Sequence, residues 1–269
     1  MSILIDDLIN YLEKRFPPEL AAEWDSSGWQ YRGTNKETAS IVISLDVTKK
    51  TVQAAEANGA NLILSHHPIL FDMPDYLDCR VYPASALCES IRSDISIYSL
   101  HTNIDSASGG MNDYLASLFG MKEIKIPEIS GNFDKELSFS RIGTIQPVNF
   151  DEIAQRCIEL FNIDSFRVIG NKPEVIRRLL VVSGSGSSII KKLSPDSFDL
   201  AITGDLKYHD ALFFEENGYC VVDLGHFIEK KLFTEIVKDS LEEIYGNRLL
   251  YISATEKNCL RGVNGESNN

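Results

Sequence analysis

The chain lacks any uninterrupted apolar segment of the roughly 18–20 residues that a membrane-spanning helix needs. Its first residues, MSILIDDLINYLEKRF, carry acids where a secretory leader carries lysines, and no small-residue cleavage site follows them. We therefore expect a cytoplasmic protein that does not enter a membrane.

Positive charge is also scarce. The 26 lysines and arginines are outnumbered by 39 aspartates and glutamates, and the formal net charge is −13 at pH 7. Binding to a phosphate backbone depends on clustered basic side chains, and the nearest approach to a cluster, Arg177 and Arg178 beside Lys172, is explained by a solvated face. The charge argues against a nucleic-acid partner. An anionic small molecule is still compatible, because bound metal ions reverse the local field.

Cysteine is neither abundant nor closely spaced. The five cysteines are odd in number, and even Cys79 and Cys88 are nine positions apart, too far for a zinc knuckle. This usage is typical of reduced thiols rather than of a disulfide framework or a cysteine-type zinc site.

What the chain does have is a regular alternation of strand and helix patterns over 269 residues, enough for an ample core. In the first half, strands are expected at 39–45, 60–65 and 95–100, and helices at 5–16, 49–58, 84–93 and 111–119. The pattern loosens over 125–138, which suggests a link between subdomains. In the second half, strands are expected at 139–146, 165–169, 178–183, 198–203, 219–223 and 248–254, and helices at 150–162, 187–193, 207–217 and 227–244.

This alternation predicts an α/β fold of two lobes with mainly parallel or mixed sheets. We place the N-terminal lobe at 1–125 and the C-terminal lobe at 126–269, the two forming one compact unit.

All five histidines lie in four short motifs, each where a strand should end. The motifs are LILSHHPILF with His66 and His67, SLHTNID with His101, TGDLKYHDAL with His209, and DLGHFIEK with His226. Carboxylates accompany them at short spacing: Asp105, Asp205 and Glu229. Imidazoles combined with carboxylates suit a divalent metal, and facing carboxylates can bridge two ions. Because ligands bind beyond the carboxyl ends of strands in open α/β sheets, we expect the site in the cleft between the lobes.

The adjacent pair His66 and His67 should point to opposite faces of an extended chain. They could therefore serve two metals, or one metal and one supporting contact; the alternative is one core and one surface histidine. His226 and Glu229, three apart on an opening helix, share a face as a chelating pair does, and Gly225 would permit close backbone approach.

Other motif residues have simpler alternatives. Asp105 could be a helix N-cap, although serines are available for that role. Asp205 is expected to cap the helix at 207–217 at least in part, and His209 is either a site residue or an exposed helix residue. The run VVSGSGSSII (181–190) lacks the lysine of a phosphate-binding loop, so a tight strand-to-helix turn is favoured.

These motifs resemble the GTP cyclohydrolase 1 type 2 homologue family over nearly the whole chain. The matching stretches are EWDSSGWQ (23–30), SLDVT (44–48), ANLILSHHPILF (60–71), HTNIDSASGGMNDYLA (101–116), VVSGSGSS (181–188), TGDLKYHDA (203–211) and DLGHFIEK (223–230). The HHP and GH…E elements carry most of the resemblance. The three-residue spacing of the last His and Glu is the shorter form, with Lys230 where the longer form has its Glu.

The resemblance implies a two-lobed α/β protein without the inserted domain of longer relatives, assembled as a ring-like homohexamer. It implies a dinuclear centre of two divalent ions, such as Zn, Fe or Mn. The implied ligands are His66, His67, Asp105, His226 and Glu229, with Glu229 and Asp105 shared between the ions.

The implied activity is metal-dependent hydrolysis of a small molecule: water attack at C8 of a purine nucleoside triphosphate, followed by ring opening. His101 and His209 would be nearby catalytic residues, one or the other of which moves protons, and neither would be an obligatory ligand. From its motif alone, His101 is either a metal ligand or an acid–base that contacts a bound water or the substrate. The alternative is a metal-handling or regulatory protein without turnover. A pure interaction scaffold is a third interpretation, and it would predict that His67 and Glu229 are dispensable.

Overall fold

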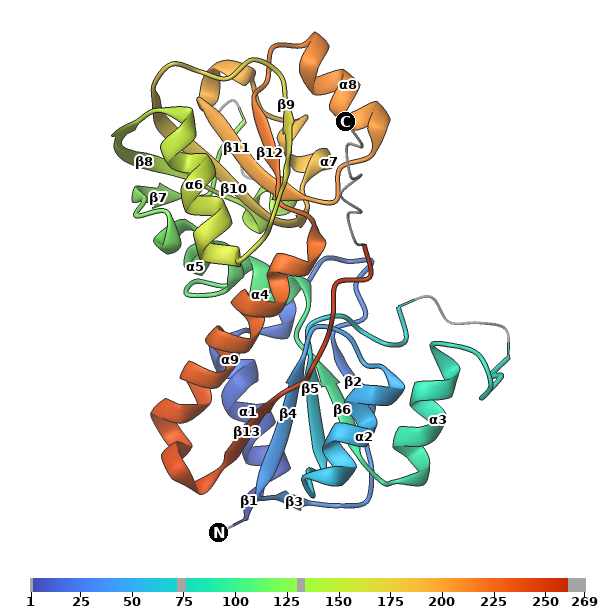
Figure 1. Ribbon diagram of the computed structural model, residues 1–269. Helices are drawn as coiled ribbons and strands as arrows, with labels where there is room; N and C mark the ends of the chain where they lie inside the picture. Colours follow the sequence, from blue (N-terminus) through green and yellow to red (C-terminus); the bar gives the residue numbers. More distant parts are fainter. Residues whose placement is uncertain (1, 72–75, 130–133, 261–269) are drawn as a thin grey trace, which may run out of the picture.

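Two α/β lobes lie end to end, and a long helix runs from their junction along one of them (Figure 1). The structure is a computed structural model that describes residues 2–71, 76–129 and 134–260. We call the lobe that contains the first described residues lobe 1 and the other lobe 2. Within the described residues, the sheet of lobe 1 has the order β13 (Leu250–Ser253), β4 (Ser40–Ser44), β5 (Leu62–Ser65), β6 (Ser96–Ser99), β2 (Gly28–Tyr31). The sheet of lobe 2 has the order β7 (Lys122–Lys125), β8 (Arg141–Val148), β10 (Ile176–Ser185), β11 (Leu200–Gly204), β12 (Val221–Asp223), β9 (Arg167–Ile169).

Both sheets are mixed with a parallel centre, in agreement with the predicted α/β fold. In lobe 1, β13, β4, β5 and β6 are parallel and β2 runs antiparallel. In lobe 2, β10, β11 and β12 are parallel, while β7, β8 and β9 are antiparallel to their neighbours. A small ladder of β1 (Ile3–Leu4) and β3 (Glu37–Thr38) lies apart from both sheets.

The helices follow the predicted alternation with local differences. They are α1 (Ile5–Arg15), α2 (Lys49–Ala57), α3 (Ala84–Arg92), α4 (Thr102–Ser106), α5 (Met111–Leu118), α6 (Phe150–Phe161), α7 (Ser187–Ile190), α8 (Tyr208–Glu216) and α9 (Glu229–Tyr245). The short α4 is absent from the prediction, and α7 ends three residues before the predicted end. No helix in the described part of the chain is long and apolar enough to cross a membrane.

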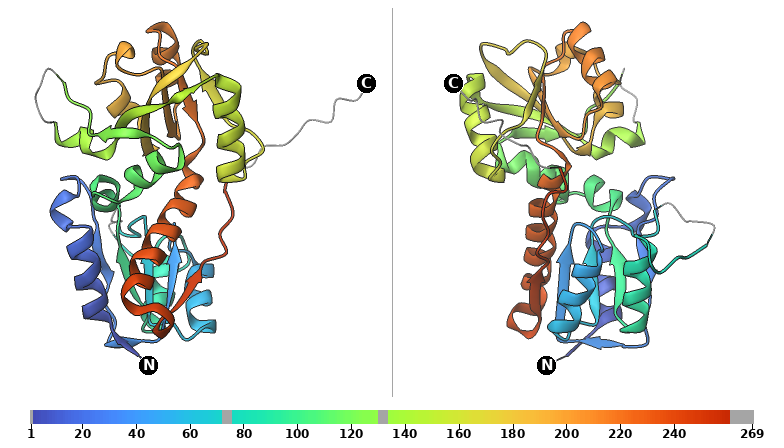
Figure 2. Two further views of the ribbon diagram at one scale, coloured as in Figure 1. Left: turned by 90° about the vertical axis from the view of Figure 1, so that its left-hand side faces the viewer. Right: turned by 45° about the vertical axis from the view of Figure 1, so that its right-hand side comes forward.

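Helices cover both faces of the lobe 1 sheet, because its central strands are apolar on both sides. Ile41 and Ile43 of β4 join a cluster with α1 and α9, while Val42 joins a second cluster with α2 and α3. Figure 2 shows α9 on one side of this sheet and α3 on the other.

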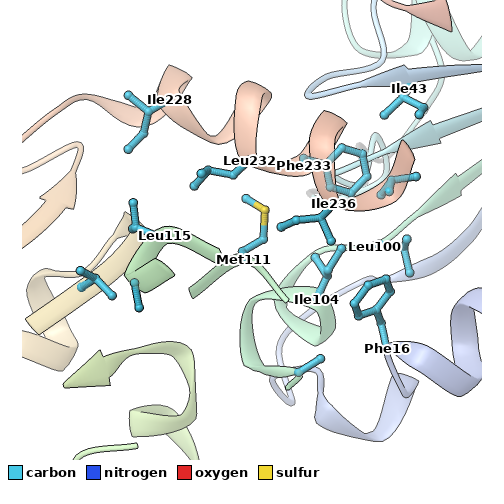
Figure 3. Close-up of a cluster of buried hydrophobic side chains, with 14 of the residues drawn as sticks. Phe16, Ile43, Leu100, Ile104, Met111, Leu115, Ile228, Leu232, Phe233 and Ile236 are labelled. Atoms are coloured by element: carbon cyan, nitrogen blue, oxygen red, sulfur yellow. The ribbon is translucent and has the colours of Figure 1, made fainter. Parts of the chain in front are cut away.

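One apolar core runs through the junction of the lobes (Figure 3). Leu232, Phe233 and Ile236 of α9 lie in it with Met111 and Leu115 of α5. The same cluster extends into both sheets. The lobes therefore share buried apolar surface instead of meeting through a hydrated interface.

On each side of the boundary predicted at residue 125, a segment of the chain belongs to the lobe on the other side. Strand β7 pairs with β8 in lobe 2, although it precedes that boundary. At the other end, α9 carries the chain back so that β13 pairs with β4 in lobe 1. Lobe 1 is thus built from both ends of the described chain.

The expectation of reduced thiols is wrong for two of the five cysteines. Cys79 and Cys88 form a disulfide, with their Cα atoms 5.7 Å apart. Cys88 lies on α3 and Cys79 in the segment before it, and their Cα separation is within the ordinary range for a disulfide in spite of the nine-residue spacing. Cys157 and Cys220 are free and buried, and Cys259 is free and exposed.

Candidate metal centre

Five predicted ligands converge at the junction of the lobes. His66 and His67 directly follow β5, and Asp105 lies on α4 after β6. His226 begins a single 3-10 turn (His226–Ile228) after β12, and Glu229 is the first residue of α9. The carboxyl ends of the parallel strands of both sheets thus deliver the side chains to one place.

The first group consists of His66, Asp105 and Glu229, all buried. The His66 Nε2 lies 3.9 Å from the Asp105 Oδ1 and 3.8 Å from the Glu229 Oε1. These separations are too long for hydrogen bonds, yet the three atoms face one another. The group therefore has the donor chemistry and the spacing of an ion site.

The second group consists of His67, His226 and Glu229. The Glu229 Oε2 is 3.4 Å from the His67 Nε2 and 2.8 Å from the His226 Nε2, and the two ring nitrogens are 3.1 Å apart. Ligand atoms placed tetrahedrally about 2.0–2.2 Å from one ion are roughly 3.3–3.6 Å apart. The second group is close to that spacing.

Glu229 links the two groups through separate oxygens, its Oε1 facing His66 and its Oε2 facing His67 and His226. The Oε2 is buried and has no hydrogen-bond partner of good geometry among the described residues. A buried carboxylate oxygen without such a partner is costly unless a cation satisfies it. This oxygen is the direct indication that the residues fit metal ions.

A polar contact at Nδ1 fixes the ring orientation of both adjacent histidines, His66 and His67. The His66 Nδ1 is 2.9 Å from the carbonyl oxygen of Leu100, so this nitrogen carries the proton and donates. The His67 Nδ1 is 2.8 Å from the Asp46 Oδ1. In both rings Nε2 is left to face the carboxylates, which is the orientation that metal ligation requires.

Charge coupling is strong within the cluster. Burial alone lowers the pKa of His67, but its hydrogen bond with Asp46 and the nearby carboxylate of Glu229 raise it to about 10. Burial alone raises the pKa of Glu229, yet the imidazole of His66 and its neighbours hold that pKa well below the ordinary value. Burial raises the pKa of Asp105. The shared carboxylate thus attracts positive charge, either protons or metal ions.

His101 lies beside the cluster and is held by a carboxylate that the spacing of the motifs does not reveal. Its ring centroid is 5.2 Å from that of His66. The His101 Nδ1 is 2.7 Å from the Asp25 Oδ1, and Asp25 also accepts hydrogen bonds from Ser27 and Thr102. These contacts leave Nε2 as the ring nitrogen available to the cavity that His101 lines.

His209 does not join the cluster. It is exposed on α8, with its ring against Tyr208 at a centroid distance of 5.5 Å, and it belongs to neither the cavity lining nor the ligand groups of the described residues. Asp205 is not the cap of α8, whose N-cap is Lys207. Instead the Asp205 Oδ2 lies 3.6 Å from the His226 Nδ1.

The glycine–serine run forms the predicted tight strand-to-helix turn, from β10 through Gly186 to α7. Gly184 has φ +60°, and a Cβ there would lie 2.9 Å from the Glu229 Oε1. The Ser183 hydroxyl donates to the Asp105 Oδ1 at 3.1 Å. The run therefore lets a backbone approach the shared carboxylate and orients a second one. At Gly225, where the sequence suggested a close backbone approach, no atom lies within 4 Å of the Cβ position. Its backbone has φ +76°, a conformation that favours glycine.

A cavity of about 350 Å³ opens onto the cluster, within the range of small-molecule sites. Trp24, Phe71 and Phe139 supply aromatic wall, and His101, His226 and Glu229 supply polar groups. Since Trp24 and Phe71 precede the boundary at residue 125 and Phe139 follows it, the cavity lies between the halves of the chain, as predicted.

Two supporting residues, Asp25 and Asp46, escape prediction from the spacing of the histidines. They are 76 and 21 residues away from their histidine partners. A signal for Asp46 exists, because it directly follows the apolar strand 39–45 and reaches the same sheet edge as His66 and His67. Asp25 lies in a loop between two tryptophans and follows no predicted strand, so the sequence carries no comparable signal for it.

Comparison with known proteins places these features in a family. The family described as Duf34/NIF3 (NGG1p interacting factor 3) matches residues 3–258. A Lactococcus lactis protein named GTP cyclohydrolase 1 type 2 homolog is 32% identical over 257 residues, which cover 94% of this chain and 97% of the relative. A Streptococcus pneumoniae protein of the same name is 33% identical over 233 residues, 84% and 86% of the two chains. The solved structure of a Bacillus cereus protein related to NIF3 shares the fold, with a TM-score of 0.83 and 21% identity over 97% of this chain and 99% of that one.

Proposed function

Because this chain belongs to the Duf34/NIF3 family, we propose that it is a dinuclear metal-dependent hydrolase. The observation that carries the proposal is the position of Glu229. Its Oε1 faces His66 and its Oε2 faces His67 and His226, so that one buried carboxylate serves two ligand groups. Asp105 completes the first group. We propose Zn, Fe or Mn as the pair of ions, since all suit imidazole and carboxylate ligands.

Two divalent ions in these groups would supply an activated water and polarise the substrate. The chain's own residues do the rest. The pair of Asp25 and His101 holds a ring nitrogen at the cavity, where it can accept or return a proton. His209, exposed on α8, has no place in this role within one chain. The cavity beside the cluster favours turnover over metal storage, because storage needs no space for a substrate.

The proposed substrate is a planar, electrophilic small molecule, with a purine nucleotide as the first candidate. Trp24, Phe71 and Phe139 provide faces and edges for a flat ring. The names of the relatives, GTP cyclohydrolase 1 type 2 homolog, agree with that candidate. We further propose a homohexamer, which the sequence resemblance implies, and a cytoplasmic location, which is the expectation from the acidic first residues.

Metal content tests the centre. Protein purified without chelator should hold two divalent ions per chain, and Glu229→Gln should lose both, because it serves both groups. His209→Ala is the matched control and should keep both ions. One ion per chain, or an unchanged content in Glu229→Gln, contradicts a dinuclear centre.

Turnover tests the hydrolase. Metal-loaded protein mixed with GTP should release formate and change the ultraviolet absorbance of the purine. Since a His101 ring nitrogen also lies within ligand distance of His66 and His67, His101→Ala is compared with wild type at equal metal content. It should lose roughly 10²–10⁴-fold in rate, the usual loss of a general acid–base. Full metal content with no turnover of GTP or related phosphates and amides would instead favour a metal-handling protein.

A further inference from the structure

Behind the second ligand group, a C-terminal side chain reaches back to the strand that supports His67. Both oxygens of Glu256 accept backbone N–H groups: the Leu45 amide at 3.0 Å and the Asp46 amide at 2.8 Å. The Glu256 side chain is only 9% exposed. A carboxylate that accepts two amides in a buried position fixes the backbone to which they belong.

The segment held by Glu256 is the one that orients His67. The Asp46 Oδ1 accepts from the His67 Nδ1 at 2.8 Å, and the Leu45 carbonyl accepts from the His67 amide at 2.9 Å. Ring and backbone of this ligand are therefore both attached to Leu45 and Asp46. A shift of these two residues would move Nε2 of His67.

The same C-terminal segment is attached to the start of α9. Lys230 donates from its Nζ to the Ala254 carbonyl at 2.8 Å, and its Nζ lies 3.8 Å from the Glu256 Oε2. Lys230 directly follows Glu229. Residues 254–256 thus connect the end of β4 with the first turn of α9, the two elements that hold His67 and the shared carboxylate.

The first ligand group has a different set of supports. His66 is held by the Leu100 carbonyl, and Asp105 by the Ser183 hydroxyl. The polar contacts of Glu256 are with Leu45, Asp46 and Lys230 instead. The C-terminal segment therefore supports the ring of His67, which belongs to the second group and not to the first, and it approaches the first group only beside the shared Glu229.

We infer that Glu256 is a positioning residue for the ion held by His67, His226 and Glu229. The inference rests on the proposed dinuclear centre and goes beyond it, because it assigns an ion-selective role to a side chain outside both ligand groups. Partners that orient ligands are worth about 10–100-fold in metal affinity. Loss of Glu256 should therefore weaken one ion by that factor and leave the affinity for the other nearly unchanged.

Titration of the metal-free full chain with Co²⁺ tests this, with the visible absorption of the bound ion as the readout. Glu256→Ala should show one ion weakened at least tenfold and an altered Co²⁺ spectrum, as in His226→Ala and unlike His66→Ala. Glu256→Gln keeps the volume and one acceptor oxygen, and should fall between wild type and Glu256→Ala. Glu174→Ala, an exposed glutamate of lobe 2, is the control and should titrate as wild type does.

Equal weakening of both ions in Glu256→Gln, or no change in either Glu256 variant, overturns the inference. A thermal melt of each metal-free variant separates loss of folding from loss of positioning, and if Glu256→Ala does not fold, Glu256→Gln decides. Failure of the wild-type chain to bind two ions contradicts the proposed function instead, so the two failures are distinguishable.

Discussion

Asp25 receives more hydrogen bonds than a loop carboxylate ordinarily does. Its oxygens accept from the His101 ring, from the Ser27 hydroxyl and from both the amide and the hydroxyl of Thr102. Burial alone would raise its pKa, but the His101 hydrogen bond and charge, with the hydroxyl donors, lower that pKa far below the ordinary 3.8. The folded state therefore favours the ionised carboxylate of Asp25 more than the unfolded state does.

This difference predicts an acid-dependent loss of stability. An aspartate with a depressed folded-state pKa stabilises the fold fully above its unfolded-state pKa, and this contribution is lost as the pH falls below about 3.8. Denaturant unfolding of the metal-free protein should therefore show a free energy that falls with pH in that window. Asp25→Asn should reduce the slope, and equal slopes in both proteins would refute the assignment.

Individual residues also show which parts of the candidate site could be predicted from the sequence. The histidine motifs predicted that His66, His67, Asp105, His226 and Glu229 would lie together, because each follows the end of a parallel strand and these ends face the junction of the two sheets. His209 satisfied the same pattern but lies in an exposed first turn of α8, since the orientation of that helix is set by packing that the motif does not encode. The loop pairing of Asp25 with His101, and the disulfide of Cys79 with Cys88, depend on turns with no periodic signal.

At the scale of elements, the end of β10 must pass close to the start of α9. Gly184 has φ +60°, and a Cβ on it would lie 2.9 Å from the Glu229 Oε1. Gly218, after α8, has φ +77° with nothing within 4 Å of its Cβ position. Both glycines thus have a positive φ, but only Gly184 has another atom close to its Cβ position.

Alanine at each glycine separates these effects. Gly184→Ala and Gly218→Ala should each lower the unfolding free energy by about 1–3 kcal/mol, because alanine is strained at positive φ. Only Gly184→Ala should also weaken metal binding, since it displaces the shared carboxylate. Metal titration and denaturant unfolding of both variants provide the measurement; equal metal affinities would show that the contact is tolerated.

The order of helices and central strands along the chain was easier to predict than the short strands at the edges of the sheets. The alternation of apolar strands and amphipathic helices located nearly every helix and the central strands. The short strand β2 was missed because its sequence, GWQY, lies in a loop-like stretch rich in Gly and Ser. The strand β7 was missed for a related reason: its four residues, KEIK, are all exposed and carry no burial pattern.

For the whole molecule, the ligand groups draw on separate parts of the chain, and metal should therefore stabilise the protein as a unit. An ion that binds only the folded state adds about 2.7 kcal/mol at one hundred times its Kd, or roughly 5–10 °C in Tm for a chain of this size. A thermal melt with and without chelator measures this shift. Glu229→Gln should show almost none of it and His209→Ala all of it; a shift that survives in Glu229→Gln would place the stabilising ion elsewhere.

The return of the chain to lobe 1 has a consequence for biosynthesis. Strand β13 pairs with β4 along one edge of the first sheet, and α9 covers one face of that sheet. Because a ribosome releases the N-terminal part first, the edge beside β4 and the part of that face under α9 stay uncovered in the nascent first lobe until all of lobe 2 has been translated. The last described strand thus completes a sheet whose central strands are among the earliest to be made.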